Sequence, residues 1–552
     1  MSTTAAGEFD FVIVGAGSAG CVLANRLSAD GRHRVALLEA GGPDKNFLIR
    51  MPIGYGKIAF EPGESWHYFS APEPGLDGRR MLLPRGKGLG GSSNINGLIY
   101  IRGQAADYDD WAAAGADGWA WSDVLPWFKY SERHVRGAAA DHGTADHGNT
   151  YHGAAGLLRA QRATERDRTN DAILAAFEAC GTPRIDDFNT GDQRGCGYYD
   201  SIIDGGERWS AARAFLRPAE TRSNLAIFTH ALAERLLIEA GKVTGVAFQR
   251  GGQKFVIRAR REVFLTAGAY QSPQLLQLSG IGDPELLQSF GISVAVARPA
   301  VGTNLQDHLV VPMGFRVRAG VFSYNHELAG WPLLRNFVRY LLRRDGPLTI
   351  PAAQTGAFVS SDPNVARPDL QYHCLPVTGD LAVAAAGGKG ELSKHPGVTI
   401  APCVLRPKSR GHVRLTVASA VEPPSIVHNY LLDPVDQAVT LNGMRYARRL
   451  IESPALAPLI ESEADPGNDA QSDAALLAFA RAYGSTGYHP VGTCRMGRDD
   501  AAVVDPQLRV RGVAGLRVAD ASVMPQLISG NTHAACVMIG ERAADFALRE
   551  AK

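Results

Sequence analysis

The sequence predicts an α/β fold with two domains, and three observations support this prediction. An apolar run at residues 9–14 is followed by a glycine-rich turn, a helical pattern and a second apolar run at residues 35–39. Strand-like segments return at residues 262–266 and 516–519. Residues 412–417 instead alternate between polar and apolar side chains. We therefore expect a Rossmann-like nucleotide-binding domain assembled from discontinuous segments, and a second domain with antiparallel sheet and helices.

The length of the chain also indicates more than one domain. A chain of 552 residues exceeds the size at which a single hydrophobic core stops growing. We assign residues 1–100, 201–310 and 480–552 to the nucleotide-binding domain. Residues 101–200 and 311–479 are assigned to a substrate-binding domain.

Composition excludes several classes of protein. Apolar residues make up 45% and charged residues 20%, and the formal net charge of +1 gives no reason to expect a nucleic-acid partner. The seven cysteines form no C-x-x-C pair, which is typical of reduced thiols in the cytoplasm. The N-terminus lacks the pattern of a signal peptide, and no run of 18 apolar residues predicts a transmembrane segment.

The turn after the first predicted strand carries a G-x-G-x-x-G fingerprint. In this context the first glycine permits a tight turn, the second lets the backbone approach a pyrophosphate, and the third lets helix and strand pack closely. The free N–H groups at the helix start, near Ser18 and Ala19, would bind phosphate. Glu39 at the end of the second strand would bind a ribose diol and would repel a 2′-phosphate. The glycines are Gly15, Gly17 and Gly20.

A second glycine cluster favours FAD over NAD. Residues 85–96 read Arg-Gly-Lys-Gly-Leu-Gly-Gly-Ser-Ser-Asn-Ile-Asn. Such a loop can wrap the pyrophosphate and ring of a flavin with backbone amides, whereas NAD needs no loop of this kind.

Four stretches of the chain resemble the glucose–methanol–choline (GMC) oxidoreductases. They are the fingerprint with residues 38–41, the cluster at residues 86–96, the segment at residues 268–282 and the C-terminal block at residues 488–541. They follow the order of the family and span almost the whole chain. The branch resembled includes bacterial alcohol and choline dehydrogenases. The resemblance implies an enzyme that oxidises CH–OH groups with FAD, and a substrate domain that covers the flavin.

The resemblance also suggests roles for individual residues. Gly15, Gly17 and Gly20 would lie at the pyrophosphate, and Glu39 at the adenosine ribose. Ile95 stands where some members carry a histidine linked to FAD, so we expect non-covalent FAD. The remaining cofactor residues are Trp66 near the cofactor, Gly91, Ser92, Asn94 and Asn96 along pyrophosphate and flavin, Ala233 at the adenine, and Asp520 at the ribityl and phosphate region. Asp520 also suits a helix N-cap, and both roles can hold at once.

The expected chemistry needs a base for the hydroxyl proton and a donor for the forming alkoxide. His489 lies in a Tyr-His-Pro-Val-Gly-Thr stretch that resembles the one bearing the catalytic histidine of the family. The alternative is that His489 has a structural role and is held by the turn that follows it. His533, seven residues before Gly540, stands where relatives have histidine or asparagine, and we assign it as the partner of His489. Asn531 is the alternative partner, and the roles of the two histidines could be exchanged.

The sequence leaves several functions open. We expect oxidation of a primary alcohol, aliphatic or aromatic, with electrons passed to a quinone or other carrier. An alcohol oxidase, which uses oxygen and makes peroxide, would oxidise the alcohol by the same transfer of hydride to the flavin. A hydroxynitrile lyase that keeps FAD without redox turnover would also use the histidines. A light-driven decarboxylase fits less well, because that branch lacks a histidine at position 489.

Two further patterns bear on partners. Residues 331–344 form an amphipathic pattern with four arginines, which could lie on the inner membrane near a quinone. We favour the alternative, a helix packed on the substrate domain with its arginines in water. His142, His147 and His152 are too loosely spaced for a zinc site, so we expect no metal.

Overall fold

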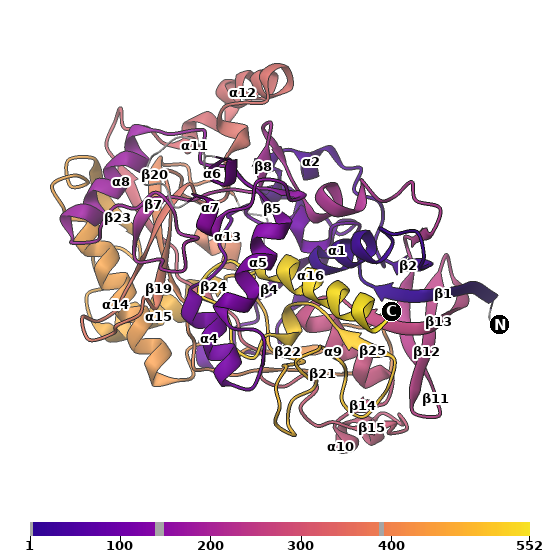
Figure 1. The fold of residues 1–552 in the computed structure, drawn as a ribbon. Coiled ribbons are helices and arrows are strands. Elements are labelled where there is room, and N and C mark those ends of the chain that lie inside the picture. Colours follow the sequence, from indigo (N-terminus) through magenta and orange to yellow (C-terminus); the bar gives the residue numbers. More distant parts are fainter. Residues whose placement is uncertain (1–3, 139–147, 386–390, 552) are drawn as a thin grey trace.

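The computed structural model describes residues 4–138, 148–385 and 391–551. Two domains lie side by side, and both chain ends lie in the domain on the right of Figure 1. Each domain is built on its own large sheet, one largely parallel and one antiparallel. The predicted fold class is therefore confirmed, while the assigned domain boundaries stay a prediction.

The first sheet has seven strands, drawn from both ends and the middle of the chain. Four of them, and β25 beside β13, run parallel, and β12 and β11 form an antiparallel extension. The strands expected at residues 9–14, 35–39, 262–266 and 516–519 all belong to this sheet. The strands are β10 (Leu225–Phe228), β2 (Val35–Leu38), β1 (Thr4–Val14), β13 (Gln253–Leu265), β12 (Lys242–Arg250), β11 (Leu232–Glu239) and β25 (Leu516–Val518).

The fingerprint forms the turn between β1 and helix α1 (Ser18–Leu27). The last residues of β1 and all of β2 are buried, as their continuous apolar runs predict for strands covered on both faces. A Cβ atom on Gly20 would lie 1.9 Å from the carbonyl oxygen of Gly15. Only glycine therefore allows α1 to start this close to the strand.

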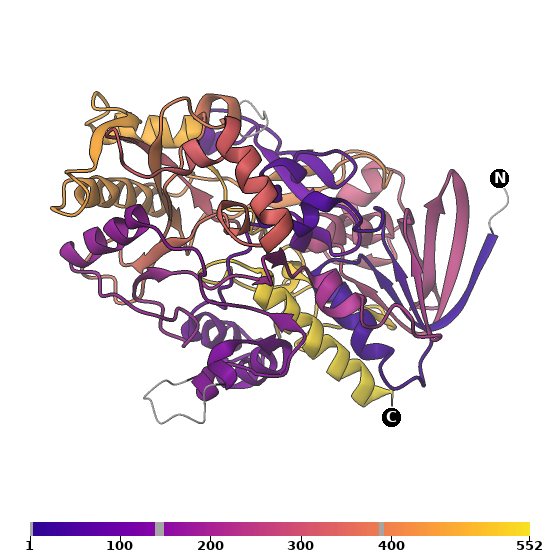
Figure 2. The ribbon, with the colours of Figure 1, turned by 90° about the horizontal axis from the view of Figure 1, so that it is seen from above.

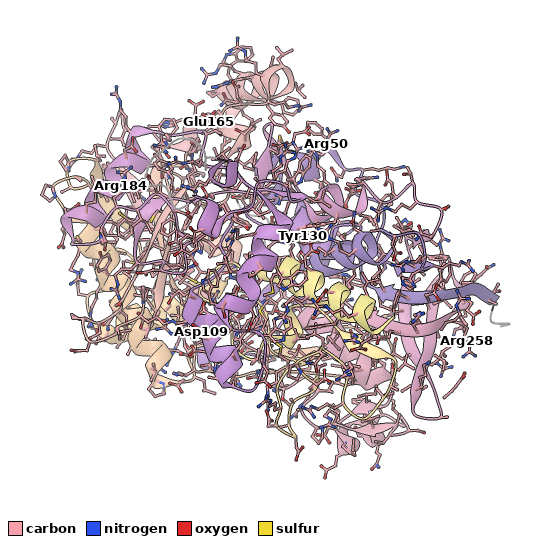
Figure 3. All side chains as sticks on the ribbon, in the orientation of Figure 1. Arg50, Asp109, Tyr130, Glu165, Arg184 and Arg258 are labelled. Atoms are coloured by element: carbon pink, nitrogen blue, oxygen red, sulfur yellow. The ribbon has the colours of Figure 1, made fainter. Side chains whose placement is uncertain are left out.

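The C-terminal helix α16 (His533–Glu550) packs along α1, and Figure 2 shows it running beside the start of the chain. A Cβ on Gly540 would come within 3.0 Å of the backbone of Ala19. Arg26 of α1 donates to both carboxylate oxygens of Glu541, at 2.7 and 2.8 Å. The guanidinium also lies 4.5 Å from the ring of Tyr130, labelled in Figure 3. These contacts join the two ends of the chain.

The second sheet has eight antiparallel strands. Helix α14 (Pro434–Ile451) packs on β20 and on α15 (Asp473–Tyr483), and α8 (Arg168–Ala179) packs on β18 and β19. The expected antiparallel domain is therefore present. The strands are β23 (Ile460–Asp465), β17 (Met313–Val317), β20 (Gly397–Val404), β19 (Leu370–Leu375), β18 (Thr355–Val359), β7 (Gly195–Tyr198), β16 (Leu309–Val310) and β24 (Ser485–Thr486).

Three local expectations differ from the structure. The strand expected at residues 412–417 is only β21 (His412–Arg414), which pairs with β22 (Ser425–Val427) outside the large sheet. Residues 137–156 are rich in glycine, histidine and aspartate, a composition that predicts a surface loop, but they include α7 (Gly148–Tyr151), while residues 139–147 lie outside the described residues. Gly153 in this stretch is buried against the chain, because an added Cβ would lie 1.9 Å from the Lys129 carbonyl oxygen.

The third difference concerns the predicted amphipathic helix. It forms as α12 (Gly330–Arg343), but its apolar stripe faces away from the substrate domain. The expected packing of the apolar side is therefore wrong except at Phe337, which packs in a cluster with Tyr340, and Asn336 and Tyr340 form the buried side instead. In the described part of the chain, no helix combines the length and the apolar composition needed to cross a bilayer.

The ion pair between α1 and α16 predicts a large stability effect. Arg26→Ala leaves the buried Glu541 carboxylate without its charged partner, which should lower the free energy of unfolding by about 3–5 kcal/mol. Arg549→Ala removes an exposed pair with Asp545 on the same helix and should cost at most about 1 kcal/mol. Denaturant unfolding of the purified protein measures both. Equal effects would show that the buried pair has no special role.

Candidate active site and cofactor cavity

A cavity of about 780 Å³ lies where the two domains meet. One side is lined by the glycine-rich turns and by strand ends of the parallel-sheet domain. The other side is lined by residues of the antiparallel domain, among them Leu328, Ile350, His373, Leu375 and Thr399. Both predicted catalytic histidines line the cavity, and so does Asn531.

The fingerprint residues divide into two groups. Gly15, Gly17, Ser18 and Ala19 line the cavity, at the start of α1. Gly20 is not among the lining residues, and it serves the close packing of helix and strand instead. The open N-terminus of α1 therefore points its free N–H groups at the cavity side, as a phosphate site requires.

Glu39 lines the same cavity at the end of β2, in nearly complete burial. Its carboxylate accepts hydrogen bonds from the backbone N–H groups of Ala16, Gly41 and Gly88 at 2.8–3.0 Å. Burial raises the pKa of the carboxyl above its ordinary value, and the three N–H groups oppose that rise. Glu39 therefore joins both glycine loops, in addition to the ribose contact expected of it. Ala233 of β11 lines the cavity nearby.

The second glycine cluster forms β4 (Leu82–Gly86) and the short helix η3 (Gly91–Asn94). Gly91 has a φ of +52°, and an added Cβ would lie 2.7 Å from the Cα of Gly17, so the two glycine loops touch. Gly91, Ser92 and Asn96 line the cavity. Asn94 is not among the lining residues, and its amide donates to the Leu89 carbonyl at 2.8 Å. Its position indicates a role in the shape of the loop.

Trp66 and Asp520 reach the cavity from two other elements. Trp66 lies on β3 (Ser65–Phe69), with the ammonium of Lys87 4.2 Å from its ring. Asp520 caps the short helix η7 (Ala521–Val523) by accepting from the Ser522 N–H, and it also accepts from the Gly268 N–H at 2.9 Å. The expected N-cap role of Asp520 is confirmed, and its cavity position is compatible with the cofactor role.

His489 is fixed by a buried carboxylate that the sequence analysis did not single out. Asp307 accepts from the backbone N–H of His489 at 2.7 Å, and from the hydroxyls of Tyr430 and Thr486. Tyr488, directly before His489, has a φ of +64°, an uncommon conformation for a large side chain. Such a conformation persists only where its surroundings enforce it, as these hydrogen bonds do here.

A chain of hydrogen bonds determines which nitrogen of His489 carries the proton. His308 Nε2 lies 3.1 Å from the carbonyl oxygen of Leu405, so this nitrogen must donate. His308 Nδ1 lies 2.9 Å from His489 Nδ1. In the neutral His308 ring Nδ1 has no proton and must accept, so His489 Nδ1 donates to it. The Nε2 atom of His489 is then an unprotonated acceptor.

Asn531 and His533 differ in what they contact. The Asn531 amide nitrogen lies 3.1 Å from His489 Nε2, which it can only approach as a donor. His533 turns its Nδ1 to the Ser18 hydroxyl at 2.8 Å. Among the described residues, no partner reaches Nε2 of His533 or the side-chain oxygen of Asn531. The structure thus brings Asn531, rather than His533, into contact with His489.

Burial keeps the imidazoles of this region neutral. It lowers the pKa of His308, His373 and His533 to about 4 each. Burial also lowers the pKa of His489 well below its ordinary value, and the nearby His308, His373 and Arg85 act in the same direction. A neutral imidazole with a free nitrogen can accept a proton, which suits the base expected here.

Sequence reasoning missed Asp307, His308 and His373. The signal available was the polar run Asn304-Leu-Gln-Asp-His308 just before the apolar residues 309–311. The structure buries Gln306, Asp307 and His308 of this run. His373 carried no comparable signal, because a single histidine in a strand is most often structural. Of the histidines weighed for zinc, His142 and His147 lie outside the described residues. His152 is buried between Glu132 and Asp187, and the described residues contain no group suited to a metal ion.

The residues present fit FAD. The cavity volume lies in the range of small-molecule and cofactor sites, about 300–1,000 Å³. Glycines with no space for a Cβ bring backbone N–H groups to one side of it. The unpartnered Nε2 of His533 and side-chain oxygen of Asn531 are polar groups that a ligand would satisfy.

Comparison with known proteins agrees with this reading. The N-terminal family model of the GMC oxidoreductases matches residues 9–310, and the C-terminal one matches residues 407–540. An alcohol dehydrogenase [acceptor] of Pseudomonas putida is 40% identical, over 98% of this chain and 96% of its own. An oxygen-dependent choline dehydrogenase of Rhizobium etli is 39% identical, over 98% and 96%.

A solved structure shows the same fold. The R554A variant of formate oxidase from Aspergillus oryzae RIB40, determined to examine FAD modification, superposes with a TM-score of 0.91. The two chains are 26% identical, and the match covers 99% of each.

The contact between the glycine loops predicts a loss of cofactor. Gly91→Ala adds a Cβ where φ is positive and Gly17 already lies, which should weaken FAD binding about tenfold or more. Gly63→Ala is the matched control, because it meets no atom within 4 Å. Flavin content after purification and titration of the apoprotein with FAD measure both. Full flavin content in Gly91→Ala would contradict the role of this contact.

Proposed function

The chain belongs to the GMC oxidoreductase family, and from this membership we propose that it oxidises a primary alcohol to the aldehyde and passes the electrons to a quinone or other carrier. It is an FAD-dependent enzyme acting on CH–OH donors. The observation that carries the proposal is the unprotonated Nε2 of His489, at the cavity and beside Asn531.

His489 acts as the base in this proposal. The substrate hydroxyl takes the place of the Asn531 amide as donor to His489 Nε2, and the proton moves to that nitrogen. His308 is a positioning residue, because its acceptor Nδ1 fixes the tautomer of His489. Bound FAD would supply the acceptor for the hydride that leaves the substrate carbon.

We propose Asn531 as the second group at the reaction site, the donor to the forming alkoxide. Its amide is a neutral donor and can stabilise the forming alkoxide once it no longer bonds to His489. His533, first assigned as this partner, bonds to Ser18 of the fingerprint instead. We propose that its free Nε2 contacts the cofactor.

The cofactor would be held by the residues of the two glycine loops that line the cavity, with Glu39, Trp66, Ala233 and Asp520. Gly20 and Asn94 would act by shaping those loops. Ile95 lines the cavity with an apolar side chain, so the position that carries a linking histidine in some relatives has no nucleophile. We propose that FAD is bound non-covalently.

The acceptor and location are parts of the same proposal. The relative from Pseudomonas putida supports a dehydrogenase that uses a carrier. We propose a cytoplasmic protein with peripheral contact to the inner membrane, where a quinone is reached. An oxidase is the second candidate, favoured by the structural likeness to formate oxidase.

The test of function is anaerobic flavin reduction. Primary alcohols added without oxygen or light should bleach the flavin of the wild type. Slow recovery in air supports a dehydrogenase, and fast recovery with peroxide supports the oxidase. A flavoprotein that no alcohol bleaches would contradict alcohol oxidation and favour a lyase.

His489→Ala should keep FAD and slow flavin reduction roughly 10²–10⁴-fold, the usual contribution of a positioned base. Stopped-flow absorbance of the anaerobic protein measures the rate. Unchanged rates would show that His489 is not the base.

The choice between the two partners can be tested directly. Asn531→Ala should lower the rate of flavin reduction roughly 10²–10³-fold, in the range seen when a donor to a developing oxyanion is removed. His533→Ala should chiefly weaken FAD retention, because its Nδ1 bonds to the fingerprint. The reverse pattern of rate and retention would restore the original assignment of His533.

A further inference from the structure

Helix α12 presents an apolar stripe to solvent. Trp331 is 75% exposed and Leu342 79%, and the side chains between them in the stripe are also exposed. At 100° per residue these side chains fall within one arc of the helix. The stripe consists of Trp331, Leu334, Val338, Leu341 and Leu342. Figure 1 shows α12 projecting from the top of the molecule, where no other helix or strand covers it.

The opposite side of α12 explains its orientation. Asn336 is buried, and its amide donates to the backbone carbonyl and the carboxylate of Glu327. Tyr340 is fully buried in a cluster with Met51 and Leu348. The helix is therefore fixed on the domain by the face that carries Asn336 and Tyr340, and the stripe cannot turn inward without breaking these contacts.

Basic side chains follow one flank of the stripe. Arg335, Arg339 and Arg343 are spaced by four residues and lie between the stripe and the body of the protein. Residues 324–345 carry four arginines against two acids, Glu327 and Asp345. Glu165, labelled beneath the helix in Figure 3, accepts from the Gly346 N–H at 3.0 Å.

The mouth of the cavity lies beside this helix. Leu328 and Ile53 line the cavity and pack in the cluster that contains Tyr340. Leu392 also lines the cavity and is 40% exposed, so the cavity reaches the surface there. The next residue, Ser393, accepts through its carbonyl from Asn325, on the short helix α11 (Tyr324–Glu327) that leads into α12.

We propose that α12 lies in the plane of an anionic lipid bilayer, with its stripe among the acyl chains and its arginines at the headgroups. An apolar stripe flanked by arginines, with tryptophan at one end, is the chemistry of an interfacial helix. This inference rests on the proposed peripheral contact and assigns it to one surface. It also places the cavity mouth at the membrane, so that a lipophilic alcohol or quinone can enter from the lipid.

A second copy of the chain explains the stripe less well. A helix of 14 residues is about 21 Å long and about 10 Å wide. A stable protein interface needs about 800 Å² from each partner. The projecting helix alone offers much less than this area, whereas an interfacial helix needs no larger surface.

The experiment uses the FAD-loaded full chain and vesicles of phosphatidylcholine with or without phosphatidylglycerol. The wild type should float with the anionic vesicles and bind the neutral ones less. Leu334→Glu with Leu342→Glu should reduce flotation at least about tenfold, because charged side chains replace two leucines that would lie among the acyl chains. The matched control, Leu432→Glu with Val435→Glu, changes two exposed apolar residues elsewhere and should bind like the wild type. Quenching of tryptophan fluorescence by brominated lipid should disappear in Trp331→Phe.

The outcomes separate this inference from the proposed function. A wild type that binds neither vesicle, or a Leu334/Leu342 variant that still binds, overturns it. A dimer in light scattering that the same variant dissociates, without vesicle binding, shows that a second copy covers the stripe. Flavin reduction by a water-soluble alcohol should be unchanged in the variant. Vesicle binding without any flavin reduction in the wild type would retain the membrane surface and reject the reaction.

Discussion

The close contact between α1 and α16 is the constraint on which the site depends. It joins residues more than five hundred positions apart, through the Arg26–Glu541 pair and the approach of Gly540 to Ala19. The N-terminus of α1 follows the glycine fingerprint turn, and the N-terminus of α16 follows Asn531. Because both helices begin at the cavity, one packing contact places the fingerprint turn beside Asn531 and His533.

Electrostatics at the site follow from burial rather than from ion pairs. His489, His308 and His373 lie near one another with low pKa values, because burial disfavours their charged forms more than the nearby Asp307 carboxylate favours that of His308. Asp307 bonds to backbone and hydroxyl groups instead of to an imidazole ring. A charged histidine here would carry a proton on both ring nitrogens. It would then have no nitrogen able to accept the proton of an alcohol.

On the outer surface, helix α12 exposes apolar side chains that would ordinarily be buried. The antiparallel domain buries its apolar residues in a continuous core, yet α12 exposes six large apolar side chains, five of them in the stripe. Its inward contacts are made by Asn336, which donates to Glu327 of α11, and by Tyr340, which packs in an apolar cluster with Phe337. An apolar stripe held outward by the Asn336 hydrogen bonds and the packing of Tyr340 lowers solubility without stabilising the fold, which is why a lipid surface is a physically reasonable partner.

The sequence by itself determined the nucleotide-binding unit, because the apolar runs, the glycines and Glu39 act over short distances along the chain. It also identified His489, through the segment that resembles the family. Tertiary structure alone decided the partner of that histidine and the direction of α12. Asn531 and His533 are two residues apart and equally polar, so only the path of the chain into α16 separates their contacts. Periodicity shows that a helix has an apolar side, but what that side faces depends on contacts between distant residues.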